Sequence, residues 1–379
     1  MRISMGTVSS LRAALITGIV LSAPLSLTAI PAAAQSTQAQ ELIQKFGLRE
    51  ARQPVRNMPN WKVPGKVVVW QNQDRLPALR AAYPSITFDS VPDAASLPSA
   101  LKGADVFIGY CIPAGVNSDH QLRWMMSLAV GVENCATSES LKRQKTLITN
   151  VKKLSGPEIA EHAIALMMAL NRGLDGFIAN QQRQVWDRSL LADQIWELEG
   201  RTVLVVGLGG IGKEVASRAH GLGMNVIATR NSRREGPDYV RYVGLADELL
   251  ELTRQADVVI NTAPLTDKTN GMFNAEFFKA MQPHAYFISI GRGLSTNTDD
   301  LVAALRNGEL GGAGLDVFDP EPLPADHPLW KQPRVIITPH MAFRSDKLRE
   351  RVWTLVEESM RRYIDGDRML NVVDLERGY

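Results

Sequence analysis

The sequence predicts an α/β protein built from two doubly wound parallel-sheet domains. Short apolar runs rich in β-branched residues alternate with helix-like segments along most of the chain, which is typical of parallel sheets covered on both faces. With 379 residues the chain is longer than one average domain and suits two. In its second half, a glycine-rich turn joins a predicted strand to a predicted helix, as doubly wound sheets require.

The first-half elements are less regular than those of the second half. A weak helix is expected around residues 41–49. The strong helix Pro157–Leu170 has Pro and Glu in its first turn and is expected to begin the second domain. Four strands are predicted before it, at residues 67–70, 86–88, 106–109 and 146–149.

The second half alternates strands and helices more clearly. Residues 346–365 at the end look helical and are expected to return and pack on the first domain. Six strands are predicted, at residues 202–206, 225–229, 258–261, 285–290, 312–317 and 335–338.

Composition narrows the class of protein. Hydrophobic residues make up 45% and charged residues 22%, an ordinary globular mixture that argues against a disordered or fibrous chain. The 42 Lys and Arg residues against 40 Asp and Glu residues leave a formal net charge of only +2. This balance gives no electrostatic reason to expect a nucleic-acid partner or a membrane surface.

The N-terminus has the pattern of a cleavable secretory signal. Arg2 and Arg12 supply a positive start, an apolar stretch runs over about residues 13–30, and three alanines end at Ala34. We expect cleavage after Ala34 and a periplasmic or secreted protein without a membrane segment. The alternative is an unprocessed tail or a wrongly chosen start, which would leave the protein cytoplasmic.

Two cysteines, Cys111 and Cys135, form neither a CxxC motif nor a zinc framework. In an oxidising compartment they can pair, but two small buried apolar residues are the expected outcome.

The turn Gly207-Leu208-Gly209-Gly210-Ile211-Gly212 has the context of a dinucleotide site, because a buried strand precedes it and a helix follows. Gly207 allows the tight turn, Gly209 lets a pyrophosphate approach the backbone, and Gly212 lets the helix pack on the strand. The helix N–H groups then face the phosphates, so Gly210 and Ile211 are also expected at the cofactor. A purely structural turn is the competing interpretation.

The residues after the second strand of this domain favour NADP over NAD. An NAD enzyme usually has Asp or Glu there, whereas this chain has Arg230, Ser232, Arg233 and Arg234 around the turn. Guanidinium groups suit the additional phosphate of NADP through paired hydrogen bonds. A solvated basic loop is the alternative.

Three segments end predicted strands, where ligands bind in such sheets: residues 290–293 (IGRG), 316–322 (DVFDPEP) and 338–340 (TPH). Upstream, residues 129–133 read AVGVE and residues 160–162 read AEH, and residues 264–266 (PLT) are followed by Thr269. Together these motifs resemble the D-isomer-specific 2-hydroxyacid dehydrogenase family, and the likeness covers nearly all of the chain after the first 34 residues.

The resemblance implies a Rossmann NAD(P)-binding domain, residues 154–343, inserted into a flavodoxin-like substrate domain. The substrate domain would combine residues 45–153 with a C-terminal return, residues 344–379. The active site would lie in the cleft between the domains, and a homodimer is expected.

The resemblance also implies that Arg292, Glu321 and His340 are the catalytic set, and the chemistry of keto-acid reduction needs these residue types. Histidine titrates near neutrality and can protonate a carbonyl oxygen. A neighbouring Glu321 would stabilise the imidazolium and orient the ring, while Arg292 would hold the substrate carboxylate. Backbone N–H groups of Val130 and Gly131 would bind the other side of that carboxylate.

On the cofactor side, family likeness adds a set of residues around the nicotinamide end. Asp316 is expected to accept from the carboxamide, with a structural role at the strand end as the alternative, and His162 is expected on a helix surface between the domains. The set comprises Ala263, Pro264, Ile290, Gly291, Arg292, Asp316 and His340.

Each catalytic assignment has a structural competitor: His340 after a proline, Glu321 as a solvated loop acid, and Arg292 as a surface ion-pair partner. The chain also departs from the family pattern. Phe343 and Arg344 stand where a small residue is usual after the histidine. Glu133 stands where Asp is common, and Gly291 replaces a common Ala.

These observations predict an oxidoreductase that transfers a hydride between NADP(H), or NAD(H), and a small 2-hydroxy or 2-keto acid of the glyoxylate or hydroxypyruvate type. A non-catalytic dinucleotide sensor or interaction protein is one alternative, and formate or phosphite oxidation is another. A secretory signal would place the protein where free NADPH is scarce. Either the cofactor stays bound, or the N-terminal interpretation is wrong.

Overall fold

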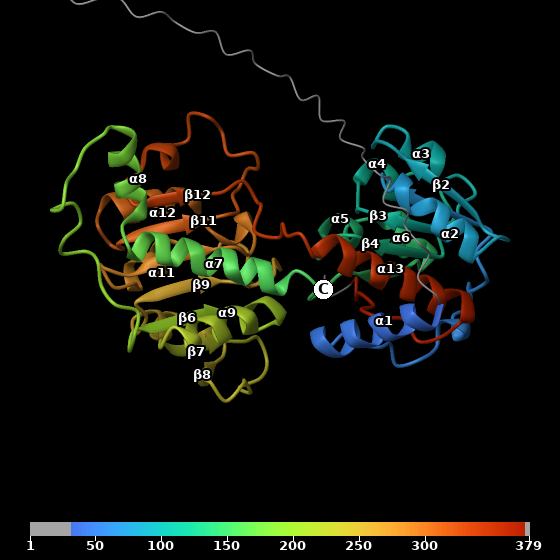
Figure 1. Ribbon diagram of the computed structural model, residues 1–379, viewed down its shortest axis with the longest axis horizontal. Coiled ribbons are helices and arrows are strands. Elements are labelled where there is room, and N and C mark those ends of the chain that lie inside the picture. Colours follow the sequence, from blue (N-terminus) through green and yellow to red (C-terminus); the bar gives the residue numbers. More distant parts are fainter. Residues whose placement is uncertain (1–31, 376–379) are drawn as a thin grey trace, which may run out of the picture.

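A computed structural model describes residues 32–375 and arranges them in two α/β lobes (Figure 1). Most of the predicted signal, residues 1–31, lies outside the described residues. The predicted cleavage position after Ala34 falls within the first described helix, α1 (Ala32–Phe46). Within residues 32–375, no helix is both long enough and apolar enough to cross a membrane.

The first lobe contains a five-stranded parallel sheet in the order β2-β1-β3-β4-β5, the flavodoxin-like order. Its strands are β1 (Lys66–Trp70), β2 (Thr87–Val91), β3 (Val106–Gly109), β4 (Trp124–Ser127) and β5 (Leu147–Asn150). Strand β4 was not predicted, because its four residues, WMMS, include no β-branched side chain, although all four are buried.

Short helices and two long ones surround this sheet. The helices are α1, α2 (Leu76–Ala82), α3 (Leu97–Ala100), α4 (Pro113–Val116), α5 (Glu133–Ala136), α6 (Glu139–Gln144) and α13 (Leu348–Asp365), with short 3-10 turns at Val55–Asn57 and Gln73–Arg75. Helix α13 comes from the C-terminal end of the chain and lies beside α1 in this lobe (Figure 1). Its Tyr363 ring stacks on the buried Trp124 ring of β4 with centroids 4.8 Å apart. Helix α13 therefore packs into the core of the first lobe.

The second lobe contains a seven-stranded parallel sheet in the order β12-β11-β10-β9-β6-β7-β8. The strands are β6 (Thr202–Val206), β7 (Asn225–Thr229), β8 (Val240–Gly244), β9 (Val258–Asn261), β10 (Tyr286–Ser289), β11 (Gly312–Leu315) and β12 (Val335–Ile337). Read from β8, this is the doubly wound nucleotide-binding order, and β12 is the one additional edge strand. Six strands were predicted; the missed edge strand β8 is half exposed and carries Arg241 and Tyr242.

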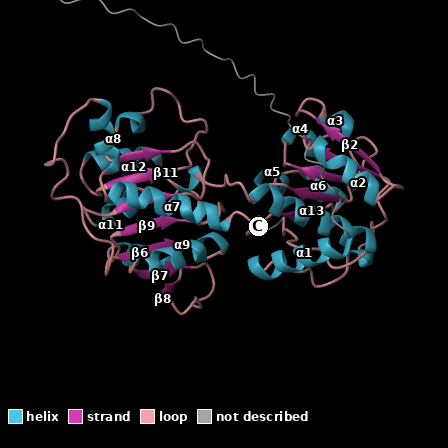
Figure 2. Ribbon diagram, viewed as in Figure 1, coloured by secondary structure: helices cyan, strands magenta, loops and turns pink. Residues whose placement is uncertain are grey.

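Helices cover both faces of the second sheet (Figure 2). They are α7 (Gly156–Asn171), α8 (Leu174–Gln182), α9 (Gly210–Gly221), α10 (Leu249–Thr253), α11 (Ala275–Ala280) and α12 (Thr298–Arg306), with 3-10 turns at Ala246–Glu248, Gly293–Ser295 and Pro328–Lys331. Within β6, Leu204 and Val206 belong to one apolar core, whereas Val203 and Val205 belong to the core on the opposite face. Burial on both faces explains why this strand reads as a continuous apolar run.

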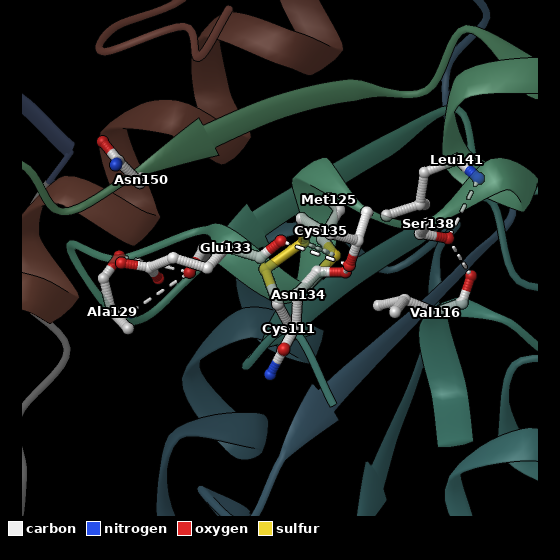
Figure 3. The surroundings of a disulfide bond; sticks show 12 residues. Cys111, Val116, Met125, Ala129, Glu133, Asn134, Cys135, Ser138, Leu141 and Asn150 are labelled. Carbon is white, nitrogen blue, oxygen red and sulfur yellow. Dashed lines mark hydrogen bonds between the residues drawn. A yellow bond between two sulfur atoms is a disulfide. The ribbon is translucent and has the colours of Figure 1, made fainter. Parts of the chain in front are cut away.

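Cys111 and Cys135 form a disulfide bond (Figure 3), so the expectation of two separate apolar cysteines was wrong. Cys111 follows β3, and Cys135 lies in α5 after the neighbouring strand β4. Because β3 and β4 pair in parallel, the ends of both strands lie at one edge of the sheet, where the two Cα atoms are 5.2 Å apart.

Candidate active site

The three segments predicted to carry catalytic residues follow adjacent strands. Residues 290–293 come directly after β10, residues 316–322 after β11, and residues 338–340 after β12. These strands are neighbours in the sheet and run parallel, so their carboxyl ends meet at one edge. The topology thus gathers Arg292, Glu321 and His340 at the same edge.

His340 and Glu321 are directly hydrogen-bonded. The Nδ1 atom of His340 lies 2.8 Å from Oε2 of Glu321, and the other carboxylate oxygen accepts from the Phe318 N–H at 2.9 Å. The carboxylate therefore orients the ring with Nδ1–H as donor and leaves Nε2 for another partner. The His340 side chain is 44% exposed, so a small ligand can reach it.

Asp316 anchors the backbone that carries His340. Its carboxylate is 1% exposed and accepts hydrogen bonds from the Met341 and Ala342 N–H groups at 2.9 and 3.0 Å. It also accepts from the Thr338 hydroxyl at 2.6 Å. These three donors favour the structural role over the expected contact with a nicotinamide carboxamide, which stays a prediction.

His162 of α7 extends this network, a role that the sequence analysis did not assign to it. Because the Thr338 hydroxyl donates its hydrogen to Asp316, its oxygen can accept from His162 Nε2 at 2.8 Å. The same nitrogen lies 3.6 Å from the Asp316 carboxylate. The side chain is 25% exposed and fixes the segment after β12 rather than simply lying on a helix surface.

Arg292 reaches from the second lobe to the first. Its Nε donates to Oε1 of Glu133 at 2.9 Å, and its Nη1 donates to the Gly291 carbonyl at 2.8 Å. The Ser295 hydroxyl holds the Arg292 carbonyl at 2.6 Å. Hydrogen bonds therefore fix both the guanidinium and the backbone carbonyl of Arg292.

Gly293 joins the Arg292 segment to the Glu321 segment. A Cβ atom at this position would lie 1.6 Å from the Phe318 carbonyl oxygen, so only glycine fits there. Since the Phe318 N–H also binds Glu321, the two predicted catalytic residues are connected through closely packed backbone.

Val130 and Gly131 lie in the loop between β4 and α5, and Gly131 faces Arg292. A Cβ atom at Gly131 would lie 2.5 Å from Nη2 of Arg292. Within residues 32–375, the N–H groups of Val130 and Gly131 donate to no other group, while the Val130 carbonyl accepts from Asn150 at 2.8 Å. The guanidinium thus lies against a loop with two unpaired N–H groups, and both kinds of donor suit a carboxylate.

The glycine turn after β6 fits a dinucleotide. Gly207 has φ +95°, and a Cβ atom there would lie 2.9 Å from the Ala263 Cα. A Cβ atom at Gly212 would lie 2.2 Å from the Gly207 carbonyl oxygen. Nothing lies within 4 Å of a Cβ position at Gly209, the residue that caps α9, so the chain leaves space beside the N-terminus of this helix.

The other predicted cofactor residues surround this turn. Ala263 is buried and contacts Gly207, Pro264 beside it is exposed, and Gly210 and Ile211 open helix α9. Buried Ile290 donates its N–H to the Asn261 carbonyl at 3.2 Å. A Cβ atom at Gly291 would lie 2.9 Å from the Ala263 carbonyl, which explains glycine at this position.

The basic loop after β7 divides its arginines between two roles. Arg234 is held by the Glu248 carboxylate at 2.6 Å and by the Tyr242 hydroxyl at 2.9 Å. Glu248 accepts hydrogen bonds from both Arg234 and the Tyr242 hydroxyl, and these lower the pKa of Glu248 to about 2. Within residues 32–375 the guanidinium of Arg230 donates only to the Glu235 carbonyl, at 2.8 Å, and Ser232 and Arg233 are exposed. Of the three arginines in this loop, Arg230 and Arg233 therefore have no carboxylate partner within residues 32–375.

Several contributors to the site escaped the sequence analysis. Buried Asn261 donates to the Ser289 and Ser295 hydroxyls at 3.2 and 2.9 Å and so supports the Arg292 turn. Its only sequence signal was its place at the end of β9.

Phe343 and Arg344, the bulky residues that follow His340 in the sequence, are exposed. Among residues 32–375, no cluster of His, Cys, Asp and Glu side chains can hold a metal ion.

Residues 164–342 match the profile of the D-isomer specific 2-hydroxyacid dehydrogenase, NAD binding domain. The chain is 33% identical to the glyoxylate reductase of Korarchaeum cryptofilum over 68% of this chain and 77% of that protein. It is 30% identical to glyoxylate/hydroxypyruvate reductase A of Escherichia fergusonii over 73% and 88% of the two chains.

Among solved structures, an NADPH-dependent glyoxylate/hydroxypyruvate reductase from Sinorhizobium meliloti, in complex with NADP and sulfate, superposes with a TM-score of 0.70. It is 27% identical, and the match covers 83% of this chain and all of that one. Sequence and fold therefore agree that the chain belongs to the D-isomer specific 2-hydroxyacid dehydrogenase family, whose members are NAD(P)-dependent oxidoreductases.

Proposed function

We propose that this protein reduces a small 2-keto acid of the glyoxylate or hydroxypyruvate type with NADPH. The hydrogen bond between His340 and Glu321 carries the proposal, because it leaves the Nε2 atom of an oriented, accessible imidazole free for proton transfer. The names of the relatives support the substrate class.

The protein's own groups bind the substrate and supply the proton. Arg292 and the N–H groups of Val130 and Gly131 would bind the substrate carboxylate from two sides. This places the adjacent carbonyl towards His340, whose Nε2 gives its proton to the carbonyl oxygen while Glu321 stabilises the imidazolium. A bound reduced nicotinamide would supply the hydride that the carbonyl carbon receives. The product is the 2-hydroxy acid.

The preference for NADPH rests on the loop after β7. Arg230 and Arg233 bind no carboxylate within the described part of the chain, and no Asp or Glu directly follows β7. Arginines in this position suit a ribose phosphate, whereas a carboxylate would repel it.

We also propose export and a homodimer. The Cys111–Cys135 disulfide supports an oxidising compartment, which accords with removal of the N-terminal signal after Ala34. Apolar side chains on α8 and just after it, Ile178 and Trp186 among them, are exposed and offer a surface for a second copy. N-terminal sequencing of protein from fractionated cells tests export, and light scattering of the purified protein tests the dimer.

The decisive assay follows NADPH oxidation with glyoxylate and with hydroxypyruvate, compared with formate and phosphite as donors to NAD and NADP. We expect turnover with the keto acids, and His340→Ala should nearly abolish it while NADPH still binds with similar affinity. Absence of turnover with both keto acids would reject the reductase. Turnover with formate or phosphite alone would assign a different dehydrogenase reaction, and NADPH binding without any turnover would indicate a sensor.

A further inference from the structure

Glu133 fixes the orientation of the Arg292 guanidinium from across the space between the lobes. The ion pair joins Glu133 Oε1 to Arg292 Nε at 2.9 Å, and the Gly291 carbonyl occupies Nη1. Nη2 donates to no group within residues 32–375. A Cβ atom at Gly131 would lie 2.5 Å from Nη2 and 2.5 Å from Glu133 Oε2, so both side chains border the loop with the unpaired N–H groups. The carboxylate of Glu133 thus turns the unoccupied end of the guanidinium towards the place proposed for the substrate carboxylate.

This ion pair contributes more to the orientation of Arg292 than to the stability of the fold. The side chains of Glu133 and Arg292 are 45% and 32% exposed. Pairs this accessible to solvent contribute at most about 1 kcal/mol to folding, because water screens the attraction. An arginine without such a partner retains many rotamers, and each one that points elsewhere weakens binding of the substrate.

The position of Glu133 depends on a very short helix. Glu133 is the first residue of α5, which has four residues and is far too short to be stable by itself. Cys135 in the same turn is fully buried and bonded to Cys111 at the end of β3. In Figure 3, Glu133 extends from α5 between the disulfide and Ala129 of the neighbouring loop.

Besides the disulfide, burial of Val132 and Cys135 in the apolar core ties this turn to the sheet. The Ser138 hydroxyl, after the helix, donates to the Val116 carbonyl at 2.8 Å. The remaining hydrogen bonds of Ala136 and Thr137 stay within the turn itself. The disulfide is therefore the covalent link between the β3 end of the sheet and the turn that carries Glu133.

We propose that Glu133 is a positioning residue for Arg292, and that the Cys111–Cys135 disulfide holds it in that position. The proposal rests on the carboxylate-binding role of Arg292 in the proposed function. A consequence is that affinity for the keto acid depends on the oxidation state of the cysteine pair. A dithiol reductant would break the S–S bond, give two electrons and two protons to form two thiols, and itself become a disulfide.

The first test compares Glu133→Gln and Glu133→Asp with the matched control Glu139→Gln, an exposed glutamate of α6. In Glu133→Gln, the KM for glyoxylate should rise about tenfold, as loss of one charge-assisted hydrogen bond predicts. The kcat at saturation and the Kd for NADPH should change little. Glu133→Asp should restore most of the affinity, whereas general disruption of the loop would not be rescued by the shorter carboxylate.

The second test measures KM before and after reduction of the wild-type enzyme with a dithiol, with thiol titration to verify the reduction. We expect KM to rise severalfold with kcat retained, and no further rise when Glu133→Gln is reduced, because both changes act through the same contact. The KM of the Cys111→Ser/Cys135→Ser variant should equal that of the reduced enzyme and should not change when the dithiol is added.

The outcomes separate this proposal from the proposed function. An unchanged KM in Glu133→Gln rejects the positioning role. A loss of NADPH affinity as large as the loss of affinity for glyoxylate rejects it too. An unchanged KM in fully reduced wild type rejects the role of the disulfide. If the oxidised wild type turns over neither keto acid, the reductase proposal fails. Calorimetric binding of oxalate as a carboxylate probe then replaces KM in each comparison.

Discussion

The buried carboxylate of Asp316 holds the backbone that positions His340. His340 has φ +53°, a left-handed conformation that is uncommon outside glycine, and its N–H donates to the Asp316 carbonyl at 2.8 Å. Both oxygens of the Asp316 carboxylate then accept the N–H groups of the next two residues. Such a backbone conformation persists only where neighbours enforce it, so Asp316 is the residue that keeps the imidazole in place.

We predict that Asp316→Asn damages both stability and turnover. An amide nitrogen cannot accept a hydrogen bond, so at least one buried N–H beside His340 would lose its partner, at a cost of about 1–3 kcal/mol. Displacement of the ring should lower kcat on the order of 100-fold. Urea unfolding and steady-state kinetics measure the two effects.

Asp326→Asn, at an exposed aspartate that accepts no hydrogen bond within residues 32–375, is the matched control and should leave both quantities unchanged. If Asp316→Asn instead weakened only NADPH binding, with normal stability, the carboxylate would serve the cofactor rather than the backbone.

Arg230→Asp should move the cofactor preference from NADPH towards NADH. The substitution removes a guanidinium at the proposed phosphate site and adds a charge that repels phosphate. The kcat/KM for NADPH should fall at least about tenfold, while NADH gains a ribose acceptor. Arg254→Asp makes the same charge change at an exposed arginine after α10 and should leave the preference as it is. An unaltered ratio of the two cofactors in Arg230→Asp would remove Arg230 from the phosphate site.

Gly293→Ala should uncouple the Arg292 and Glu321 segments. The added methyl would overlap the Phe318 carbonyl, so the backbone must move, with a cost of about 1–3 kcal/mol and a marked loss of kcat. Gly221→Ala at the end of α9 adds a methyl where nothing lies within 4 Å, and it should be neutral. Thermal unfolding and NADPH oxidation would detect the difference, and equal stability of the two variants would contradict the packing argument.

Local sequence patterns predicted what depends on neighbours along the chain, and they missed what depends on topology. The glycine turn at Gly207 and the strand-end segments are encoded by contiguous residues, so their places were predictable. His162 binds Thr338 across 176 positions, and Glu133 binds Arg292 across 159. The first pair forms because α7 packs on β12, and the second because the two lobes meet, and periodicity carries no information about either arrangement.

The pH dependence of stability offers a test in α13, where adjacent glutamates have opposite shifts. Burial alone would raise the pKa of Glu358, but hydrogen bonds from Arg361 at 3.0 Å and Arg362 at 2.6 Å lower it below its ordinary value of 4.5. A lowered pKa in the folded state means stability that is present above pH 4.5 and lost as the pH falls through the folded value. For Glu357, burial raises the pKa, so its charge opposes folding at neutral pH.

Glu358→Gln should therefore destabilise the protein at pH 7 by about 1–2 kcal/mol, because Arg361 and Arg362 lose a charged partner. The difference from wild type should shrink as the pH falls below 4.5 and through the lowered folded pKa, where the wild-type carboxyl also becomes neutral. Glu357→Gln is the matched control and should be neutral or stabilising at pH 7, because it removes a charge that opposes folding. Urea unfolding at several pH values measures both. A deficit in Glu358→Gln that stayed constant with pH would show that lost packing, not lost charge, causes it.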